Sequence, residues 1–311
     1  MTKAIEEPKV VSPRANWEHF DLYRRVKAAL DGLFIHFSSE TYIEGISATD
    51  IFTLNATLGA TIEDQVVNTL NQVRAIWDPD GKYSLYSFIR QPQTFPDVLF
   101  KGQPENKEAG EIILGIELKG WYLLSKEGEP SFRYQITPSA CAAQDLLVVV
   151  PWALKNVISG HPRIFPPYVV SAKYAAELRN YHWKHGRKSG SDQSLVSPQG
   201  VAPYPSKSDH ILDRPKADAG GNFGRFARTG IMDSYITKAK QERLCGIPAE
   251  YWLQFFKIFV EQREDSVLRE QIEKLKKKAH EAANVMERGQ SDSIKNILIE
   301  VEALLNVSNT V

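Results

Sequence analysis

Cysteine is scarce in this chain of 311 residues, which has only Cys141 and Cys245. Two separated cysteines cannot form a disulfide framework, and neither has the closely spaced partners of a zinc site. The most apolar stretch, residues 146–153, is far shorter than the ~20 residues that a transmembrane helix needs. The first residues also lack the apolar segment of a secretory signal. We therefore expect a cytoplasmic protein without a membrane partner.

The chain also has no excess of charge, because 38 basic residues balance 38 acidic ones. Residues 151–190 depart from this balance, with seven Lys and Arg residues against one acidic residue. Such a basic segment can bind phosphate groups, although a solvated basic surface has the same composition. A hydrophobic content of 42% is ordinary for a globular protein and excludes a disordered or fibrous chain.

Hydrophobic periodicity predicts an α/β fold. Apolar residues recur at helical spacing in residues 17–38 and 60–77, and Thr61 is a possible N-cap of the second helix. Apolar runs typical of strands follow at residues 83–89, 96–100, 111–124, 145–152 and 166–170, before a helix near 174–183. This order predicts a central mixed β-sheet flanked by helices.

The rest of the chain differs in character. Residues 186–230 are rich in Gly, Ser, Pro and Lys and predict a long loop-rich insertion, a feature that is often functional. From residue 249 onward the apolar residues return to helical spacing, which predicts a C-terminal helical hairpin. We therefore predict a core domain at 1–248 and a helical region at 249–311.

The most specific pattern lies between residues 96 and 119. Pro96 and Asp97 begin one predicted strand, and Glu117-Leu118-Lys119 lies within the next. Because side chains alternate along a strand, Glu117 and Lys119 share one face of an otherwise apolar strand. Charges placed there are costly unless they are paired or bind a ligand.

Asp97 and Glu117 would be brought together if the two strands are neighbours. Two carboxylates suit Mg²⁺, which keeps several waters and binds substrate phosphate. Lys119 beside them could stabilise a pentavalent phosphate or activate an attacking water. The alternative is structural: Glu117 and Lys119 form an ion pair, and Asp97 caps a turn.

The pattern Asp97…Glu117-x-Lys119 resembles the PD-(D/E)XK nuclease superfamily and, within it, the type II restriction endonucleases. Glu63, in the helical run LGATIEDQVVNTLN, looks like the acidic residue that many of these enzymes place beside the metal. The resemblance covers residues 50–185. It implies a restriction-endonuclease-like fold, catalytic roles for these four residues, and magnesium-dependent hydrolysis of phosphodiesters in double-stranded DNA.

Two further expectations concern partners and cofactors. A palindromic DNA target requires two-fold symmetry, so we expect a homodimer, with the C-terminal helices as its interface. The glycine-rich run at 220–226 lacks the Lys-Ser/Thr of a phosphate loop, so we expect no organic cofactor. The rival functions are a structure-selective repair or recombination nuclease of the same fold and a non-catalytic DNA-binding protein.

DNA contacts are predicted from basic residues that alternate with aromatic ones near residues 173–190, and from arginines in the insertion. Such residues bind phosphates and base edges, although a polar helix end has the same composition. The predicted contacts are Lys173, Arg179, His182, Lys184, Arg187, Lys188, Arg225 and Arg228.

Overall fold

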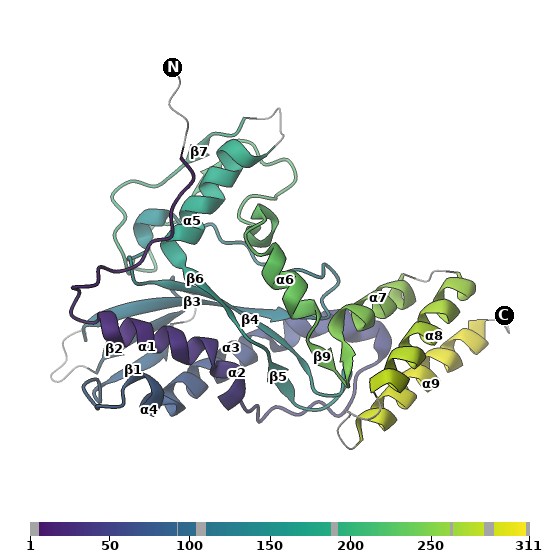
Figure 1. Ribbon diagram of the computed structural model, residues 1–311. Helices are drawn as coiled ribbons and strands as arrows, with labels where there is room; N and C mark the ends of the chain where they lie inside the picture. Colours follow the sequence, from purple (N-terminus) through teal and green to yellow (C-terminus); the bar gives the residue numbers. More distant parts are fainter. Residues whose placement is uncertain are drawn as a thin grey trace.

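The computed structural model describes residues 6–91, 93–103, 110–187, 192–261, 264–282 and 289–308. A mixed β-sheet lies between two layers of helices (Figure 1). Its strands are β1 (Tyr86–Arg90), β2 (Val98–Gly102), β3 (Ile112–Tyr122), β4 (Leu146–Leu154), β5 (Pro162–Ile164) and β6 (Tyr168–Ser171). The order is β1-β2-β3-β4, and β5 and β6 both pair with β4. Strands β3 and β4 are parallel and the other pairs antiparallel, so the predicted mixed sheet is confirmed.

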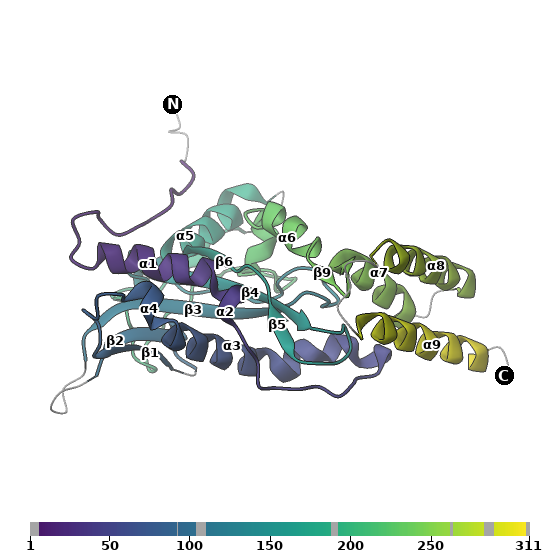
Figure 2. The same ribbon diagram turned by 60° about the horizontal axis from the view of Figure 1, so that its bottom comes forward.

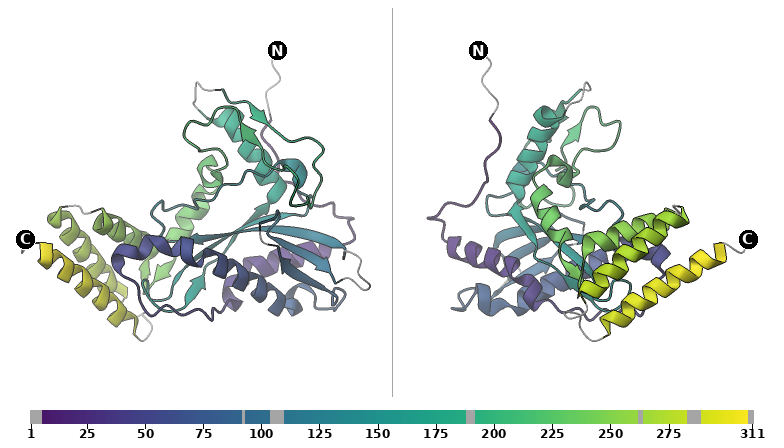
Figure 3. Two further views of the ribbon diagram at one scale, coloured as in Figure 1. Left: turned by 180° about the vertical axis from the view of Figure 1, so that it is seen from behind. Right: turned by 45° about the vertical axis from the view of Figure 1, so that its right-hand side comes forward.

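Helices cover both faces of the sheet. They are α1 (Phe20–Asp31), α2 (Leu33–His36), α3 (Leu54–Gln72), α4 (Arg74–Trp77), α5 (Ala172–Tyr181) and α6 (Asp233–Lys240). Helices α1, α3 and α4 lie on one side, and α5 and α6 lie on the other (Figures 1 and 3). None of the described helices is long and apolar enough to cross a membrane.

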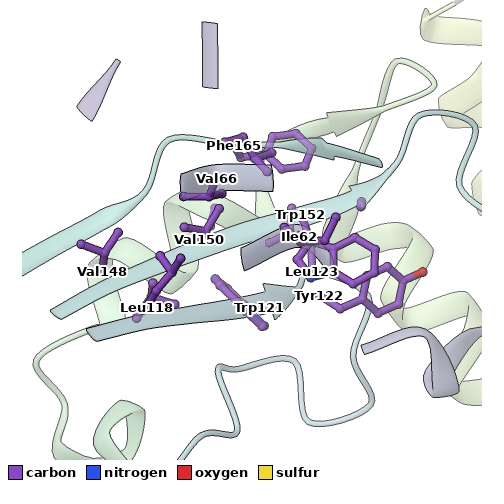
Figure 4. Close-up of a cluster of buried hydrophobic side chains, with 14 of the residues drawn as sticks. Ile62, Val66, Leu118, Trp121, Tyr122, Leu123, Val148, Val150, Trp152 and Phe165 are labelled. Carbon is purple, nitrogen blue, oxygen red and sulfur yellow. The ribbon is translucent and has the colours of Figure 1, made fainter. Parts of the chain in front are cut away.

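Helix α3 packs against the sheet through residues spaced four apart. Leu54, Leu58, Ile62 and Val66 are buried along this face, and Ile62 and Val66 lie close to strands β3 and β4 (Figure 4). The helix begins at Leu54, six residues before the predicted start at residue 60. Thr61 is therefore inside the helix, and its predicted role as an N-cap is wrong.

Strand β4 is the centre of the core. Its sequence LLVVVPWAL is buried at every position, because helices or loops cover both faces. The sequence did not indicate β5, a strand of three residues that extends the sheet beside the second half of β4. A run of only three residues shows too little alternation of apolar and polar side chains to be distinguished from a loop.

Helices again dominate the C-terminal part. After a short hairpin of β9 (Arg243–Leu244) and β10 (Ile247–Pro248), the chain forms α7 (Ala249–Val260), α8 (Asp265–Ala282) and α9 (Gln290–Ser308). Trp252, Phe255 and Phe256 of α7 are buried in the main core. Helices α8 and α9 form the predicted hairpin, which projects from one end of the sheet (Figure 2).

The described part of the 186–230 insertion has little regular structure. After a π-helical turn, η3 (His182–Gly186), it contains the paired strands β7 (Leu195–Val196) and β8 (Arg214–Pro215) and a 3₁₀ turn, η4 (Phe226–Thr229). Two further 3₁₀ turns, η1 (Ala48–Thr53) and η2 (Pro138–Ala140), lie elsewhere in the core. The β7–β8 segment, residues 195–215, lies on the α5 side of the sheet (Figure 3).

Candidate active site

The candidate site lies where β2 and β3 separate. The two strands pair from Lys101 to Val98, but β3 continues for six residues beyond the last pair, Val98–Ile116. Oxygens of side chains take the place of the missing strand. The amides of Leu118, Gly120 and Tyr122 donate hydrogen bonds to Asp97 Oδ2 (3.0 Å), Glu63 Oε1 (3.1 Å) and Asn55 Oδ1 (3.2 Å).

Asp97, Glu117 and Lys119 meet at this free edge. The Lys119 ammonium lies 2.9 Å from Asp97 Oδ2 and 2.8 Å from Glu117 Oε1, so both carboxylates point at one cation. The Asp97 amide also donates to Glu117 Oε2 at 3.3 Å. Leu118 is buried on the α3 side (Figure 4), and strand alternation therefore directs Glu117 and Lys119 to the opposite face.

A glycine makes this approach possible. A Cβ atom on Gly115 would lie 2.3 Å from Cγ of Pro96, which is too close for any side chain. The Pro96 ring thus fits against bare backbone of β3, two residues before Glu117. This close packing holds the turn that brings Asp97 to the strand edge.

Burial dominates the electrostatics of the group. It raises the pKa of Glu117 to about 7, although Lys119 opposes the shift, and the nearby Asp97 adds to it. Burial alone would lower the pKa of Lys119, but the two carboxylates outweigh it and raise the pKa above the ordinary value. Lys119 is therefore protonated at neutral pH, and both Asp97 and Glu117 face its single charge.

Glu63 reaches the same edge from α3. Besides the Gly120 amide it contacts Arg90 of β1, whose Nη2 lies 3.3 Å from Glu63 Oε2. Burial raises the pKa of Glu63, while the Gly120 amide and Lys119 oppose the shift. The sequence did not single out Arg90, because it ends a strand without any motif around it.

A cavity of about 630 Å³ lies beside the carboxylates. Asp97, Glu117 and residues 93–95 line it together with residues of the β7–β8 segment. From that segment come Lys207, His210 and Arg214, together with Ser206 and Asp209. The insertion therefore borders the predicted site.

Sequence reasoning missed these three basic residues. They lie in the predicted insertion, but neither helical nor strand periodicity marks the place where an irregular segment returns to the sheet. A weak signal was present in the charge of the run SKSDH at residues 206–210.

The donor set was tested against the magnesium that the resemblance implies. In the described part of the chain no group of three or more His, Cys, Asp and Glu side chains could hold a metal ion. Asp97 and Glu117 nevertheless converge on a cation, the Lys119 ammonium, within 2.9 Å. One or two carboxylates beside space for water and phosphate are what Mg²⁺ prefers, so the residues fit this ion.

The burial of Arg179 contradicts one of the predicted DNA contacts. Its side chain is 2% exposed, and Nη1 donates to the carbonyls of Tyr134 (2.7 Å) and Ile136 (3.0 Å). Nη2 pairs with the fully buried Asp213 of the β7–β8 segment. A guanidinium enclosed in this way cannot reach a DNA phosphate, so the prediction of a DNA contact at Arg179 is wrong.

The other predicted DNA contacts do not line the cavity, and Lys188 lies outside the described residues. Lys184 is exposed, whereas the Arg187 guanidinium stacks 3.6 Å from the centre of the Trp183 ring. Arg228 pairs with Glu129 at 2.9 Å. The remaining three, which are half-buried, are Lys173, His182 and Arg225.

Comparisons with known proteins returned no match: no family model matches the chain, and no curated protein or solved structure is significantly similar to it.

Proposed function

We propose that this protein is a magnesium-dependent, sequence-specific DNA endonuclease of the type II restriction class, with a restriction-endonuclease-like fold. The observation that carries the proposal is the convergence of Asp97 and Glu117 on Lys119, at a strand edge that borders a cavity. An ordinary ion pair needs one carboxylate and no adjacent cavity. The surplus carboxylate and the open space beside it favour a site that binds a metal and a phosphate.

Each residue has a distinct role in the proposed hydrolysis. A water oxygen forms a bond to phosphorus and loses a proton to solvent, while the bond from phosphorus to one sugar oxygen breaks and that oxygen takes up a proton from solvent. Lys119, whose pKa the carboxylates raise, stays protonated and stabilises the negative charge that develops on the phosphate. Asp97 and Glu117 orient Lys119 and would hold Mg²⁺.

A bound Mg²⁺ would supply Lewis acidity toward the phosphate and would lower the pKa of water at the site. Glu63 acts from the neighbouring position on the free edge, where it fixes the Gly120 amide and assists the metal site directly or through water. No organic cofactor takes part. The proposed substrate is double-stranded DNA, and a palindromic target would require a homodimer.

The proposal is tested by incubating the purified protein with unmethylated phage DNA, in magnesium and in EDTA. Discrete fragments that form only with magnesium are the expected result, and sequencing their ends would give the target. A smear, or selective cleavage of branched DNA, would instead indicate a structure-selective nuclease of the same fold. DNA binding without cleavage would favour a non-catalytic DNA-binding protein.

Magnesium is expected to stabilise the folded protein more at pH 8 than at pH 6. Because burial places the Glu117 pKa at about 7, the carboxylate gains its charge as the pH rises through that value. At pH 6 a smaller fraction of the carboxylate is ionised than at pH 8, so the affinity for Mg²⁺ is lower. Where magnesium is at about 100 times its Kd, the stabilisation is about 2.7 kcal/mol.

Thermal unfolding with and without Mg²⁺ at the two pH values measures this difference. The control is Glu117→Gln, which keeps the shape of the side chain but cannot ionise, and which should respond weakly to magnesium at both pH values. An equal magnesium effect on the wild-type protein at pH 6 and pH 8 would contradict the assignment of Glu117 as a ligand.

A further inference from the structure

The β7–β8 segment presents to the cavity two cations that form no salt bridge within the described part of the chain. Lys207 and Arg214 are exposed, and none of the described carboxylates forms a salt bridge with either of them. The acidic residue beside them, Asp209, is engaged within its own turn, where its carboxylate accepts the Ser206 amide at 2.7 Å. Two basic residues against one acidic residue leave this part of the lining with an excess of positive charge.

The carboxylates that line the same cavity, Asp97 and Glu117, have the opposite charge. Asp97 and Glu117 together carry one more negative charge than Lys119 balances when both carboxylates are ionised. None of the described salt bridges joins Lys207 or Arg214 to these carboxylates, although both groups line the same cavity of about 630 Å³. Cations held apart from nearby carboxylates are available to an anion that enters between them.

The segment is held in place by contacts to the core. The Asp213 carboxylate is 0% exposed and pairs with the buried Arg179 of α5. Two backbone hydrogen bonds join the segment to the strip before η2, Thr137 N to Ile211 O (2.7 Å) and Asp213 N to Gln135 O (2.9 Å). At the other end, the Tyr204 hydroxyl donates to the buried Asp145 at 3.0 Å.

These anchors lie close to the two cations in sequence. Asp213 directly precedes Arg214, and Tyr204 comes three residues before Lys207. Lys207 lies between these anchors, and Arg214 is held by Asp213 before it and by its pairing with Val196 of β7. The segment therefore loses little conformational entropy when it binds a ligand, which raises affinity. The insertion is thus a preformed wall in this region.

We propose that Lys207 and Arg214 bind two backbone phosphates of the DNA, next to the one that is cleaved, and hold the duplex against the carboxylate wall. This inference rests on the proposed nuclease function and names the surface that positions its substrate. The contacts are to phosphates and do not read the sequence, so they contribute to every duplex that the protein binds.

The test is the salt dependence of binding to a short fluorescent DNA duplex of mixed sequence, measured in EDTA so that no cleavage occurs. Each phosphate contact contributes about 0.9 to the slope of log K against log salt concentration. The double variant Lys207→Ala/Arg214→Ala should therefore reduce this slope by about 2 and weaken binding. The matched control is Arg24→Ala/Lys277→Ala, which removes the same charges at exposed positions on α1 and α8, away from the cavity.

The outcomes separate this inference from the proposed function. A reduced slope in the double variant, with an unchanged slope in the control, supports the phosphate contacts. An unchanged slope in both variants overturns the contacts, and magnesium-dependent cleavage by the wild-type protein would still stand. A reduced slope in a protein that does not cleave DNA supports the surface and rejects the nuclease. Failure of the wild-type protein to bind the duplex overturns both proposals.

Discussion

Lys119→Ala is expected to lower the rate of DNA cleavage by about 10²–10³-fold, the usual effect of removing one group that stabilises charge in a transition state. Lys119 is the cation on which Asp97 and Glu117 converge, at 2.9 Å and 2.8 Å. Its loss removes the positive charge beside the phosphate and leaves two carboxylates facing one another. The rate is measured on phage DNA at saturating magnesium.

Binding should change far less than cleavage. The proposed phosphate contacts, Lys207 and Arg214, are unchanged in this variant. Its affinity for a DNA duplex in EDTA should therefore be close to that of the wild-type protein. Lys126→Ala is the control, since it removes an exposed lysine shortly after the end of β3. Cleavage by Lys119→Ala at the wild-type rate would show that the assigned role of Lys119 is wrong.

A neutral version of the group separates catalysis from stability. Replacing buried ion pairs by uncharged residues of similar shape is often neutral for stability. The triple variant Asp97→Asn/Glu117→Gln/Lys119→Met should therefore remain folded by circular dichroism but should not cleave DNA. Cleavage by the triple variant at the wild-type rate would show that the three residues take no part in catalysis, and failure of the variant to fold would show that their charges are needed for stability.

Local sequence patterns predicted much of the core and the proximity of Asp97, Glu117 and Lys119 at the edge of the sheet. Strand alternation places Glu117 and Lys119 on one face whatever surrounds the strand, and antiparallel pairing of neighbouring runs brings Asp97 to them. These features depend on residues close together in the chain. The proximity of Glu63 depends on the packing of α3, whose apolar spacing was visible although its start was not.

The error at Arg179 was avoidable, because its position in α5 indicates burial. Ala172, Ala175, Ala176 and Arg179 follow the three- and four-residue spacing of one helix face, and the three alanines are buried. Its charge and its basic neighbours alone predict a DNA contact, whereas its helical phase indicates burial. The buried partner, Asp213, lies 34 residues later in an irregular segment, where no periodicity predicts such a pairing.

Arg179→Ala is expected to reduce the free energy of unfolding by about 3–5 kcal/mol, the usual cost of removing one partner from a buried ion pair. Asp213 is 0% exposed, and its Oδ2 accepts from Arg179 and from Asn180 Nδ2 (2.7 Å). Among the described residues its Oδ1 has no partner. Without Arg179 a single amide would remain to compensate a buried carboxylate, and the carbonyls of Tyr134 and Ile136 would each lose a donor.

Urea unfolding of the wild-type and variant proteins measures this loss. If Arg179→Ala does not fold, Asp213→Asn provides a milder change, because it removes the charge and keeps the shape. The double variant Arg179→Met/Asp213→Leu should be more stable than Arg179→Ala, since it leaves no unpaired charge. A loss below about 1 kcal/mol in Arg179→Ala, typical of an exposed ion pair, would show that the pair does not anchor the β7–β8 segment.

The Asp213→Asn variant also tests whether the Arg179–Asp213 pair supports DNA binding. If Arg179 and Asp213 hold the β7–β8 segment beside the carboxylates, weakening the pair should release Lys207 and Arg214 from their fixed positions. Affinity for duplex DNA would then fall in Asp213→Asn although both cations are still present. The salt slope would decrease less than in Lys207→Ala/Arg214→Ala, because a mobile cation still contacts phosphate for part of the time. Unchanged affinity in a variant that is clearly destabilised would restrict the pair to a role in stability.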